Sequence, residues 1–390
     1  MKILLVAGEA SGDLLGADLL AGLQVRFPDL VALGVGGPRM RRQGLQTPYD
    51  VNDLSVIGLF EVVRHLPRMF QVFRYLTGLL RRERPDLLVT IDLPDFNFVL
   101  AGQAKRLGVP VIHYVSPQVW AWRPGRVHRV ARLVDHLLVL FPFEPRYYAG
   151  TGLPVTFVGH PLVRQVKTHR SREEVRQQLG ISPDEPMVTL LPGSRDSEIA
   201  RLLPIMLQTC QQVVRSEPRC RFALAMAETL SRTDIQTHWP GDTNLAVSIH
   251  QGMTLDLLAA TDVALVASGT VTLEAALLST PMVVIYRVNR FTYEIGRRVI
   301  QVPYISLANL VAERAVVPER IQSAANPETL TTDLLTLLKD CRANMAMRHD
   351  LGVVRSRLTS PECSASDVVA EFLLKKNVAS LRKALLSTHF

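Results

Sequence analysis

The chain has 390 residues, of which 47% are hydrophobic and 21% charged, a composition that excludes a mainly disordered protein and is sufficient for two domains of ordinary size. Lys and Arg outnumber Asp and Glu by 44 to 36, so the net charge of +8 favours anionic partners such as nucleic acid, anionic lipid headgroups or phosphorylated metabolites. The four cysteines are widely spaced without a CxxC pair, which argues against a disulfide framework or a zinc knuckle and fits a reducing cytosol.

The N-terminal apolar run predicts a strand. Residues Ile3–Ala7 are too few for a signal-peptide core and are followed directly by Gly8 and Glu9. No stretch approaches the roughly 18 uninterrupted apolar residues of a membrane span, so we expect any membrane contact to be peripheral.

Short apolar runs bounded by turn residues alternate with helical patterns along the chain, which predicts an α/β fold with parallel sheets covered by helices. The predicted strands of the first half are Lys2–Ala7, Val31–Val35, Leu87–Ile91, Val109–Tyr114, His136–Leu140 and Val155–Val158. After the polar stretch Lys167–Glu185 the pattern restarts with Met187–Leu191, Phe222–Met226, Val263–Val266 and Met282–Tyr286. We therefore predict a first domain over residues 1–165, a second over 166–364, and an amphipathic helical tail over 365–390 that needs a surface to cover.

In open parallel sheets, ligands bind beyond the carboxyl ends of the strands, so the segments that follow strands are the candidate sites. The first is a glycine-containing turn that could hold an anion at the start of a helix. Its candidate residues are Glu9, Ser11, Gly12 and Asp13. The alternative is an ordinary strand-to-helix turn in which Ser11 or Asp13 caps the helix.

Asp92 follows the buried-looking strand Leu87–Ile91. A carboxylate at the rim of an apolar strand tends to have a raised pKa, which suits a general base that accepts a proton from a hydroxyl. Asp95 and Asn97 are alternatives for capping the next helix. Two acids without a third ligand do not favour a metal site.

The segment from His113 to Arg132 combines aromatic and basic residues, with Ser116 and Trp120 as candidate contacts for a sugar or lipid. The alternative is a loop whose aromatic rings cover the core beside a solvated basic helix. Interleaved aromatic and arginine residues can also bind single-stranded nucleic acid, although no RNP-like or KH-like pattern is present.

A strand runs into the turn Gly193-Ser194-Arg195 at the start of the second domain. Arginine stays charged and presents a fork of donors suited to a pyrophosphate, while glycine lets backbone amides approach the same oxygens. The alternative is a surface arginine without a role.

The turn Ser268-Gly269-Thr270 opens a helix after the strand Val263–Val266, and such a turn presents amides and hydroxyls to an anion. Glu274 could accept hydrogen bonds from two ribose hydroxyls, or it could simply compensate the charge of the helix N-terminus. The upstream loop Ile249–Thr254 offers a backbone that could contact the edge of a base.

Taken together, these segments resemble the lipid-A-disaccharide synthase family over nearly the whole chain. The matching segments are VAGEASGD (6–13), GVGGPRM (34–40), IDLPDFN (91–97), HYVSPQVWAWR (113–123), FVGHPL (157–162), LPGSR (191–195), the ASGT turn with LEA (267–275), MVVIYR (282–287) and Tyr304–Leu310. The chain departs from the family pattern at Ala308, where proline is usual, and at Glu313, where glycine is common.

The resemblance implies two Rossmann-like domains of the GT-B type and an inverting transfer of 2,3-diacylglucosamine from its UDP derivative to 2,3-diacylglucosamine 1-phosphate, giving a β-1,6 linkage. Asp92 would be the base, and Arg195 with the Ser268–Thr270 turn would stabilise the departing diphosphate without a metal or other cofactor. Gln251 and Met253 would contact uracil, Glu274 the ribose, and Asn309 would orient the nucleotide sugar.

The resemblance also implies acylated substrates, so we expect a cytoplasmic protein that binds peripherally to the inner face of the cytoplasmic membrane. The segment Val56–Leu80 interleaves apolar and basic residues, as an anionic interface requires, or it forms a buried helix with a basic outer face. In the family the C-terminal helices return to the first domain, sometimes that of a partner chain, which would make a homodimer.

Three other functions remain open from the sequence. One is a different GT-B transferase that uses a UDP-sugar, and the second is a UDP-sugar epimerase, for which we see no second acid and base. The third is a nucleotide- or RNA-binding protein without catalysis, although nucleic acid is not the partner that we expect.

Overall fold

A computed structural model describes residues 1–54, 59–121, 125–241, 245–300, 302–359 and 363–387, with the side chains of 59–65 and 377–387 left aside. The chain forms two compact units, Met1–His160 with Ser360–Phe390 and Pro161–Thr359. It therefore passes from one unit to the other twice. The sequence-based boundaries, after residues 165 and 364, lie a few residues further along the chain.

In its described part, the first unit has one six-stranded sheet in the order β2-β1-β3-β4-β5-β6, with all strands parallel. The strands are β1 Lys2–Ala7, β2 Val31–Val35, β3 Leu87–Ile91, β4 Val111–Tyr114, β5 His136–Val139 and β6 Val155–Phe157. The helices are α1 Ala10–Arg26, α2 Pro38–Arg42, α3 Leu59–Glu83, α4 Pro94–Arg106, α5 Arg126–Leu133 and α16 Ala365–Ser387, with short 3-10 turns at Val51–Asp53 and Glu144–Tyr148.

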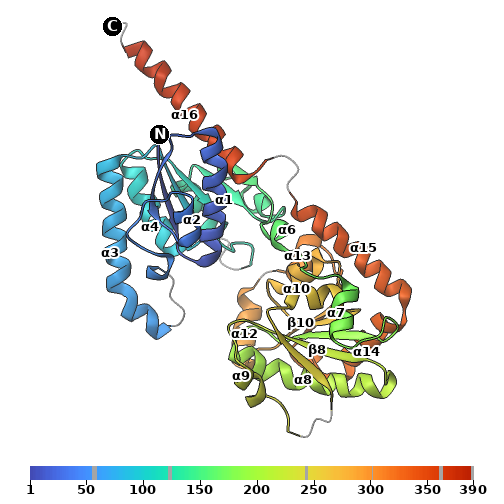
Figure 1. Ribbon diagram of the computed structural model, residues 1–390. Coiled ribbons are helices and arrows are strands. Elements are labelled where there is room, and N and C mark those ends of the chain that lie inside the picture. Colours follow the sequence, from blue (N-terminus) through green and yellow to red (C-terminus); the bar gives the residue numbers. More distant parts are fainter. Residues whose placement is uncertain (55–58, 122–124, 242–244, 301, 360–362, 388–390) are drawn as a thin grey trace. The chain divides into compact units, whose positions relative to one another are not determined.

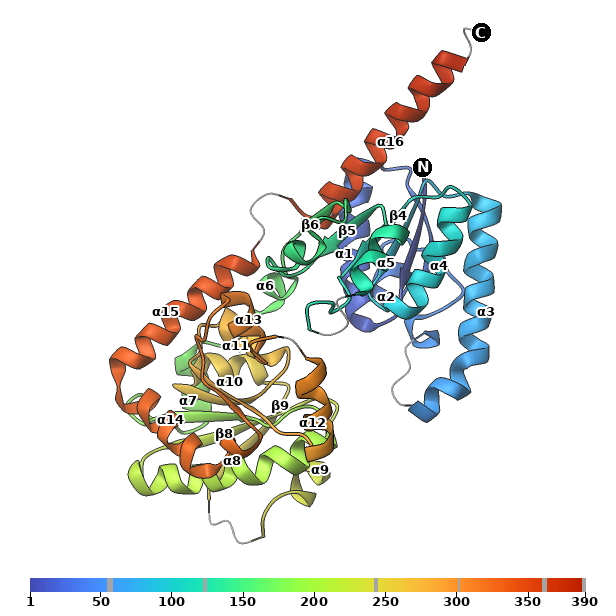
Figure 2. The same cartoon turned by 180° about the vertical axis from the view of Figure 1, so that it is seen from behind.

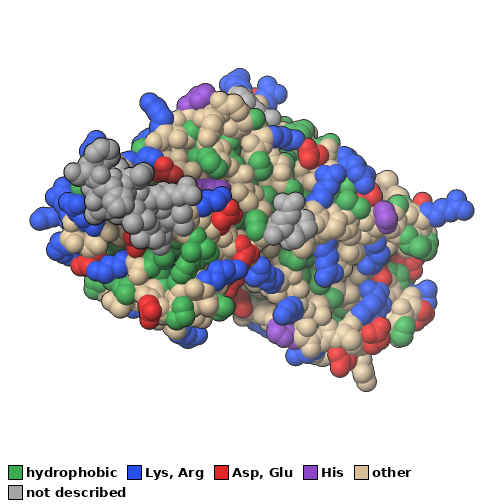
Figure 3. All heavy atoms as spheres, turned by 90° about the horizontal axis from the view of Figure 1, so that it is seen from above, with side chains coloured by type: hydrophobic (Ala, Val, Ile, Leu, Met, Phe, Trp, Pro, Cys, Tyr) green, Lys and Arg blue, Asp and Glu red, His purple; other side chains and the backbone are tan. Residues whose placement is uncertain are grey.

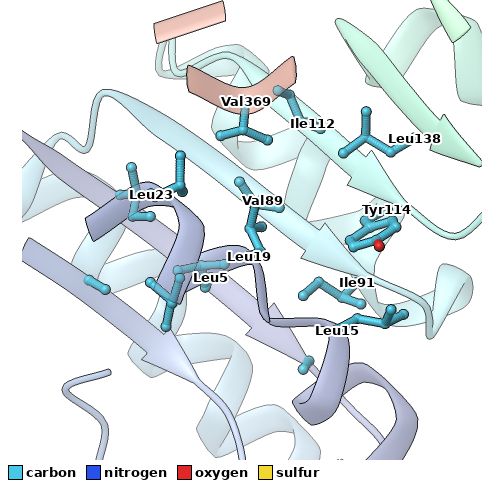
Figure 4. Close-up of a cluster of buried hydrophobic side chains, with 14 of the residues drawn as sticks. Leu5, Leu15, Leu19, Leu23, Val89, Ile91, Ile112, Tyr114, Leu138 and Val369 are labelled. Carbon is cyan, nitrogen blue, oxygen red and sulfur yellow. The ribbon is translucent and has the colours of Figure 1, made fainter. Parts of the chain in front are cut away.

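Alternate residues of β1 point into two different cores, because successive side chains of a strand face opposite sides of the sheet. Ile3 and Leu5 pack beneath α1 and α16, whereas Leu4 and Val6 pack beneath α3 and α4. Figure 4 shows the first of these cores, where Val369 of the C-terminal helix points toward the sheet beside Ile112. The amphipathic tail thus covers the first unit of its own chain.

The second unit repeats this architecture, with a parallel six-stranded sheet in the order β12-β11-β10-β7-β8-β9 among the residues described. The strands are β7 Met187–Leu191, β8 Arg221–Met226, β9 Val247–Gln251, β10 Val263–Ala267, β11 Met282–Tyr286 and β12 Glu319–Ile321. The helices are α6 Leu162–Gln165, α7 Arg172–Gln178, α8 Asp196–Ser216, α9 Arg232–Thr237, α10 Thr254–Ala260, α11 Val271–Leu277, α12 Arg290–Val299, α13 Leu307–Ala312, α14 Pro327–Lys339 and α15 Cys341–Leu358, with a 3-10 turn at Gln322–Ala324.

Helices cover both faces of this sheet, with α8 and α14 on one side and α7, α10 and α11 on the other (Figures 1 and 2). The central strands β7 and β10 are buried along their whole length, as near-continuous apolar runs require. The parallel α/β architecture predicted from the sequence is confirmed in both units.

Candidate active site

In the first sheet, the order in which the chain adds strands reverses between β1 and β3. The chain leaves β1 to form β2 on one side and then returns to form β3 on the other, so β1 and β3 are neighbours at a topological switch point. The loops that follow two such strands diverge and leave room for a ligand at the carboxyl edge. Glu9 follows β1 and Asp92 follows β3, so two predicted site residues lie at this point.

Asp92 and Leu93 both have left-handed backbone conformations, with φ of 51° and 44°. Such conformations cost on the order of 1 kcal/mol or more for each non-glycine residue, so the surrounding structure must hold them. The Asp92 N–H donates to the Tyr114 carbonyl at 2.9 Å. The amide of Asn97, which is fully buried, donates to the carbonyl of Asp92 at 2.7 Å and to that of Ile91 at 3.3 Å.

Gly8 supports the same turn from β1. A Cβ atom at Gly8 would lie 2.5 Å from Cδ2 of Leu93, a distance that real Cβ atoms essentially never show. Only glycine therefore lets the Leu93 side chain pack against the turn after β1 without displacement. Asn97 and Gly8 together fix the backbone that carries the Asp92 carboxylate.

Burial raises the pKa of the Asp92 carboxyl above its ordinary value, opposed by a hydrogen bond of 2.8 Å from the Leu93 N–H to Oδ1. The pKa of Glu9 is also raised, first by burial and then by the neighbouring negative charge of Asp92. A carboxylate in this position has a stronger affinity for a proton than one in water, as a general base for a hydroxyl requires.

A cavity of about 280 Å³ opens beside Asp92. Its lining includes Ser116 and Arg126 and the strained Val115, whose φ is 76° at the end of β4. Arg126 also forms an ion pair of 3.2 Å with Asp95 at the rim. The cavity thus places a carboxylate and a guanidinium around a space that can accept a polar ligand.

Two residues predicted for this region, Trp120 and Asp13, have structural roles. The Trp120 ring is buried against Phe143 and donates from Nε1 to Glu144 at 3.2 Å, so it covers the core and does not line the cavity. Burial raises the pKa of Glu144 to about 7. The buried Asp13 accepts hydrogen bonds of 3.0 Å from the backbone amides of Arg39 and Met40, and so caps the start of α2 instead of its own helix.

The remaining predictions for the first unit have mixed outcomes. Ser116 lines the cavity, but its hydroxyl bonds to the Tyr148 hydroxyl at 2.8 Å. Ser11 is exposed at the start of α1, and Gly12 is buried where a Cβ would lie 3.2 Å from Ala7. Trp122 and Arg123 lie outside the described residues.

The second sheet has its switch point between β7 and β10, because the chain runs outward through β8 and β9 and then returns to the other side of β7. A cavity of about 400 Å³ opens there. The sequence predicted seven of its lining residues, namely Gly193, Ser194, Arg195, Ser268, Gly269, Thr270 and Glu274.

Glu198 holds the turn that carries Arg195. Its Oε2 accepts from the amides of Ser194 at 2.9 Å and Arg195 at 3.3 Å, and its Oε1 lies 3.2 Å from Nη1 of Arg195. A Cβ at Gly193, which has φ of 115°, would clash with this carboxylate. The Arg195 side chain is 78% exposed, so its guanidinium is available to a ligand. The sequence analysis missed Glu198, although a glutamate three residues into a helix start is a known capping signal.

The opposite wall of this cavity comes from the turn after β10. The Ser268 hydroxyl donates to the Ile305 carbonyl at 3.2 Å and keeps its oxygen available as an acceptor. Apart from Gly269 and its two neighbours in sequence, no heavy atom of the described chain lies within 4 Å of a Cβ built on Gly269, so the turn faces open space at this residue. Burial raises the pKa of Glu274.

Gln251 and Met253 do not line this cavity, although the next residue, Thr254, does. Gln251 is the last residue of β9, where the sequence had predicted a loop from Ile249. Its side-chain amide donates to the Leu230 carbonyl at 3.0 Å and so ties the end of β9 to the loop after β8. The predicted base contacts thus fall beside the cavity and not within it.

Asn309 is 1% exposed and uses both polar atoms within the chain. Its Oδ1 accepts from the amides of Val316 and Val317, and its Nδ2 donates to the Val317 carbonyl and to Glu319. A direct contact with a nucleotide sugar does not fit these bonds, which hold the loop from Ser306 to Glu319 together.

The two departures from the family pattern lie in the same loop. The Ala308 N–H donates to the Ser306 hydroxyl at 3.1 Å, a bond that proline could not make. Glu313 ends α13 with φ of 57°, the left-handed conformation in which glycine carries no strain. At Ala308 the helix therefore keeps its cap from Ser306, whereas at Glu313 the backbone is strained.

Among the described residues, no group of three His, Cys, Asp or Glu side chains is arranged to hold a metal ion. Within the same residues, no helix is long and apolar enough to span a bilayer.

Comparison of the chain with solved structures indicates the fold. UDP-N-acetylglucosamine 2-epimerase from Neisseria meningitidis matches with a TM-score of 0.61 at 14% identity, over 96% of this chain and 100% of that one. MurG from Acinetobacter baumannii matches with a TM-score of 0.55 at 13% identity, over 96% and 99%. The fold is therefore of the GT-B type.

Comparison with families and curated proteins indicates the activity. The family model described as lipid-A-disaccharide synthetase matches residues 3–372. Lipid-A-disaccharide synthase of Geobacter metallireducens is 42% identical over 96% of this chain and 98% of its own, and that of Pseudomonas aeruginosa is 44% identical over 87% and 90%. With this similarity along nearly its whole length, the chain belongs to the lipid-A-disaccharide synthase family of glycosyltransferases.

Proposed function

We propose that the chain transfers 2,3-diacylglucosamine from its UDP derivative to the 6-hydroxyl of 2,3-diacylglucosamine 1-phosphate, with inversion to a β-1,6 linkage. One observation carries this proposal: each switch point holds the group that one half of the reaction needs. Asp92 lies in a cavity of the first unit, and Arg195 lies in a cavity of the second.

Asp92 acts as the general base on the acceptor. As the 6-oxygen attacks the anomeric carbon of the donor, its proton passes to the Asp92 carboxylate, and the bond from the anomeric carbon to the UDP oxygen breaks with the electron pair leaving on the diphosphate. The raised pKa of Asp92 strengthens it as a base. Its backbone N–H donates to the Tyr114 carbonyl and its carbonyl accepts from the Asn97 side-chain amide, and these two bonds hold it in place.

Arg195 and the Ser268–Thr270 turn stabilise the charge that develops on the departing diphosphate. The exposed guanidinium supplies a bidentate fork, and the turn supplies the backbone amides of Gly269 and Thr270 and the Thr270 hydroxyl in the same cavity. The amide and hydroxyl of Ser268 already donate to backbone carbonyls, so Ser268 shapes the turn. This arrangement takes the place of a metal ion, so we propose that the reaction needs none.

Glu274, half-buried in the same cavity, binds the ribose hydroxyls. Gln251 at the end of β9 and Met253 in the turn that follows, beside the cavity, contact the uracil. Asn309 orients the donor indirectly by holding the loop from Ser306 to Glu319.

The acylated substrates require a membrane surface, for which we propose α3 and a cytoplasmic, peripheral location at the inner face of the cytoplasmic membrane. Leu66 and Phe70 of this helix are 51% and 61% exposed, and Arg74 is exposed on the same helix. Phe73, by contrast, packs edge-on against Phe96, 6.0 Å between ring centroids, and so belongs to the core. The side chains of residues 56–65 lie outside the described part of the chain.

A homodimer through the tail is a further proposal. Residues 365–376 pack on their own unit, where Leu373 is buried and Lys376 donates to the Asp86 carbonyl at 2.6 Å. The rest of α16 extends beyond this contact (Figure 1). A second chain would use that extension, and sedimentation velocity of the chain ended after Lys376 tests this.

The direct test is turnover of both acylated substrates in detergent, followed by thin-layer chromatography. We expect a disaccharide 1-phosphate and UDP, with full activity in EDTA. Turnover of non-acylated UDP-N-acetylglucosamine to its epimer, or no product from the acylated pair, would refute the proposal. Restoration of an EDTA-inhibited rate by Mg²⁺ would refute its metal-free part.

A further inference from the structure

Helix α12, Arg290–Val299, lies on the surface of the second unit, and none of its ten residues is buried (Figures 1 and 2). Its first turn is defined by the Asn289 side chain, which accepts from the Thr292 amide at 2.7 Å. Isolated helices of this length are marginal in water, because most helical stability in proteins comes from packing an apolar face. Only Tyr293, Glu294 and Gly296 are partly buried, so the helix packs weakly on its own unit and leaves its apolar side uncovered.

The apolar residues of α12 form a stripe along one side. Phe291, Ile295 and Val299 are spaced four apart and are 77%, 48% and 42% exposed, and Ile300 continues the segment at 48%. Residues four apart in a helix are neighbours on its surface, so the first three form one continuous apolar face. Apolar groups gathered in this way mark an interaction surface more than scattered ones do.

Basic residues surround this stripe. Between residues 287 and 300 the chain has four arginines, all exposed, and one acidic residue, so the local charge is 4 − 1 = +3. Glu294 pairs with Arg297 at 2.9 Å. No carboxylate in the described part of the chain forms an ion pair with Arg287, Arg290 or Arg298. Three cations thus remain available beside an exposed apolar face.

We propose that α12 is a second membrane-binding element, which inserts Phe291, Ile295 and Val299 at the acyl boundary of an anionic bilayer and places its arginines among the lipid phosphates. An interfacial helix requires this combination of a large apolar side and basic flanks. An anionic bilayer matches both the apolar stripe and the arginines, since its hydrocarbon lies directly beneath a layer of negatively charged headgroups.

This inference extends the proposed function, because a transferase of lipids would then contact the bilayer from the donor-binding unit as well as through α3. The surface of the molecule is basic elsewhere too. In Figure 3, Lys and Arg side chains are spread over the face shown, with hydrophobic side chains between them. The specific feature of α12 is that four exposed large apolar side chains lie within ten consecutive residues, Phe291 to Ile300.

The test is co-sedimentation of the full chain with vesicles made of equal parts phosphatidylglycerol and phosphatidylcholine. The variant Phe291→Ser/Ile295→Ser removes the stripe, and Met345→Ser is the matched control because this residue is 63% exposed on α15 of the same unit. We expect the double variant to bind these vesicles severalfold more weakly and the control to bind normally. Arg290→Gln/Arg298→Gln should lower binding roughly fivefold per arginine, and only to vesicles that contain phosphatidylglycerol.

A second readout keeps the proposal falsifiable. The variant Phe291→Trp should show a blue shift of the new indole's emission with these vesicles and quenching by brominated lipid. Vesicle binding by the double variant equal to that of the wild-type chain, or an indole emission that vesicles leave unchanged, would overturn the proposal. Loss of self-association in the double variant, with vesicle binding intact, would also overturn it and assign the stripe to a second copy of the chain.

Turnover separates this proposal from the proposed function. The double variant should turn over detergent-dispersed substrates normally and substrates in vesicles slowly. Slow turnover of substrates in detergent as well as in vesicles would mean that α12 contacts substrate. This result would overturn the membrane role of α12 but not the proposed reaction. Failure of every form of the chain to form product would refute the proposed function, and the vesicle binding would still decide the role of α12.

Discussion

The switch points of the two sheets have the same topology and carry side chains of opposite charge. In the first unit, the loops after β1 and β3 bring together Glu9 and Asp92, whose carboxyl pKa values are both raised. In the second, the loops after β7 and β10 bring together an exposed arginine and a turn whose backbone faces open space. One topology therefore presents either two carboxyl groups or an exposed arginine at its switch point, and the loop residues decide which.

The two units also differ in how they hold these loops. The turn of Asp92 is strained and is fixed by hydrogen bonds from the Asn97 side chain to two backbone carbonyls, a placement that suits the proposed base. Glu198 bonds to the backbone of the Arg195 turn and to one nitrogen of the guanidinium, which leaves the exposed side chain able to reorient toward the proposed diphosphate.

The largest effect should come from removing the base. We expect Asp92→Asn to lower kcat by roughly 10²–10⁴ in a detergent assay, because the amide cannot accept the proton. For the wild-type enzyme, the rate should fall as the pH drops through the raised pKa of Asp92, since the base acts only when deprotonated. An Asp92→Asn enzyme with near wild-type turnover would show that the carboxylate only supports its loop.

The second-largest effect should come from removing the arginine at the switch point of the second unit. Arg195→Ala should lower kcat by about 10²–10³, because charge that develops on the diphosphate would lose a preorganised partner. Arg195→Lys should recover only part of this, since a point charge cannot reproduce the bidentate fork. Equal rates for Lys and Arg at this position would contradict a bidentate contact.

The third effect should come from removing the Asn97 side chain, which holds the strained backbone of Asp92. Asn97→Ala removes the amide that holds the Asp92 carbonyl, and we expect kcat to fall by about tenfold to a hundredfold, as for a small misplacement of a catalytic group. Thr90→Val is the matched control, because this buried hydroxyl bonds to His113 at 2.7 Å and not to Asp92.

A double variant separates positioning from general stability. If Asn97 acts through Asp92, then Asn97→Ala should cost little when Asp92 is already Asn. Additive losses in kcat, or an equal loss in Thr90→Val, would assign Asn97 a structural role only.

The smallest effect concerns the second unit, where the left-handed Glu313 lies outside the cavity of Arg195. Glu313→Gly should raise the free energy of unfolding by about 0.5–1 kcal/mol, because glycine adopts φ of 57° without strain. Urea unfolding measures this change, and kcat should stay constant. A destabilised variant would mean that the contact of Glu313 with Arg357 at 3.9 Å outweighs the strain.

Much of the fold was predictable because the central strands are fully buried. The bounds of β1, β3, β7 and β11 are the predicted ones, since apolar runs in such strands end sharply at turn residues. The bounds of β2 are also the predicted ones, although β2 lies at an edge of the first sheet and is only partly buried. The prediction missed β9 and β12, which lie at the two edges of the second sheet. Their residues are only partly buried, so the apolar signal is weak.

The candidate site was predictable where function depends on a residue type at a strand end, as for Asp92 and Arg195. It was not predictable where a role depends on three-dimensional contacts. Asn97 and Glu198 read as helix-start residues in the sequence, and their bonds to the Asp92 and Arg195 turns become visible only in the fold. Trp120 belongs to the core for the same reason, because its partner Glu144 comes from another loop.

The proposal places the base at the first switch point and the diphosphate site at the second. It is tested most directly by calorimetric titration of UDP into the wild type, Asp92→Asn and Arg195→Ala. The account predicts that Asp92→Asn binds UDP with unchanged affinity although it has lost turnover, and that Arg195→Ala binds UDP about tenfold or more weakly, as the loss of charged hydrogen bonds requires. Weakened UDP binding by Asp92→Asn, together with normal binding by Arg195→Ala, would contradict it.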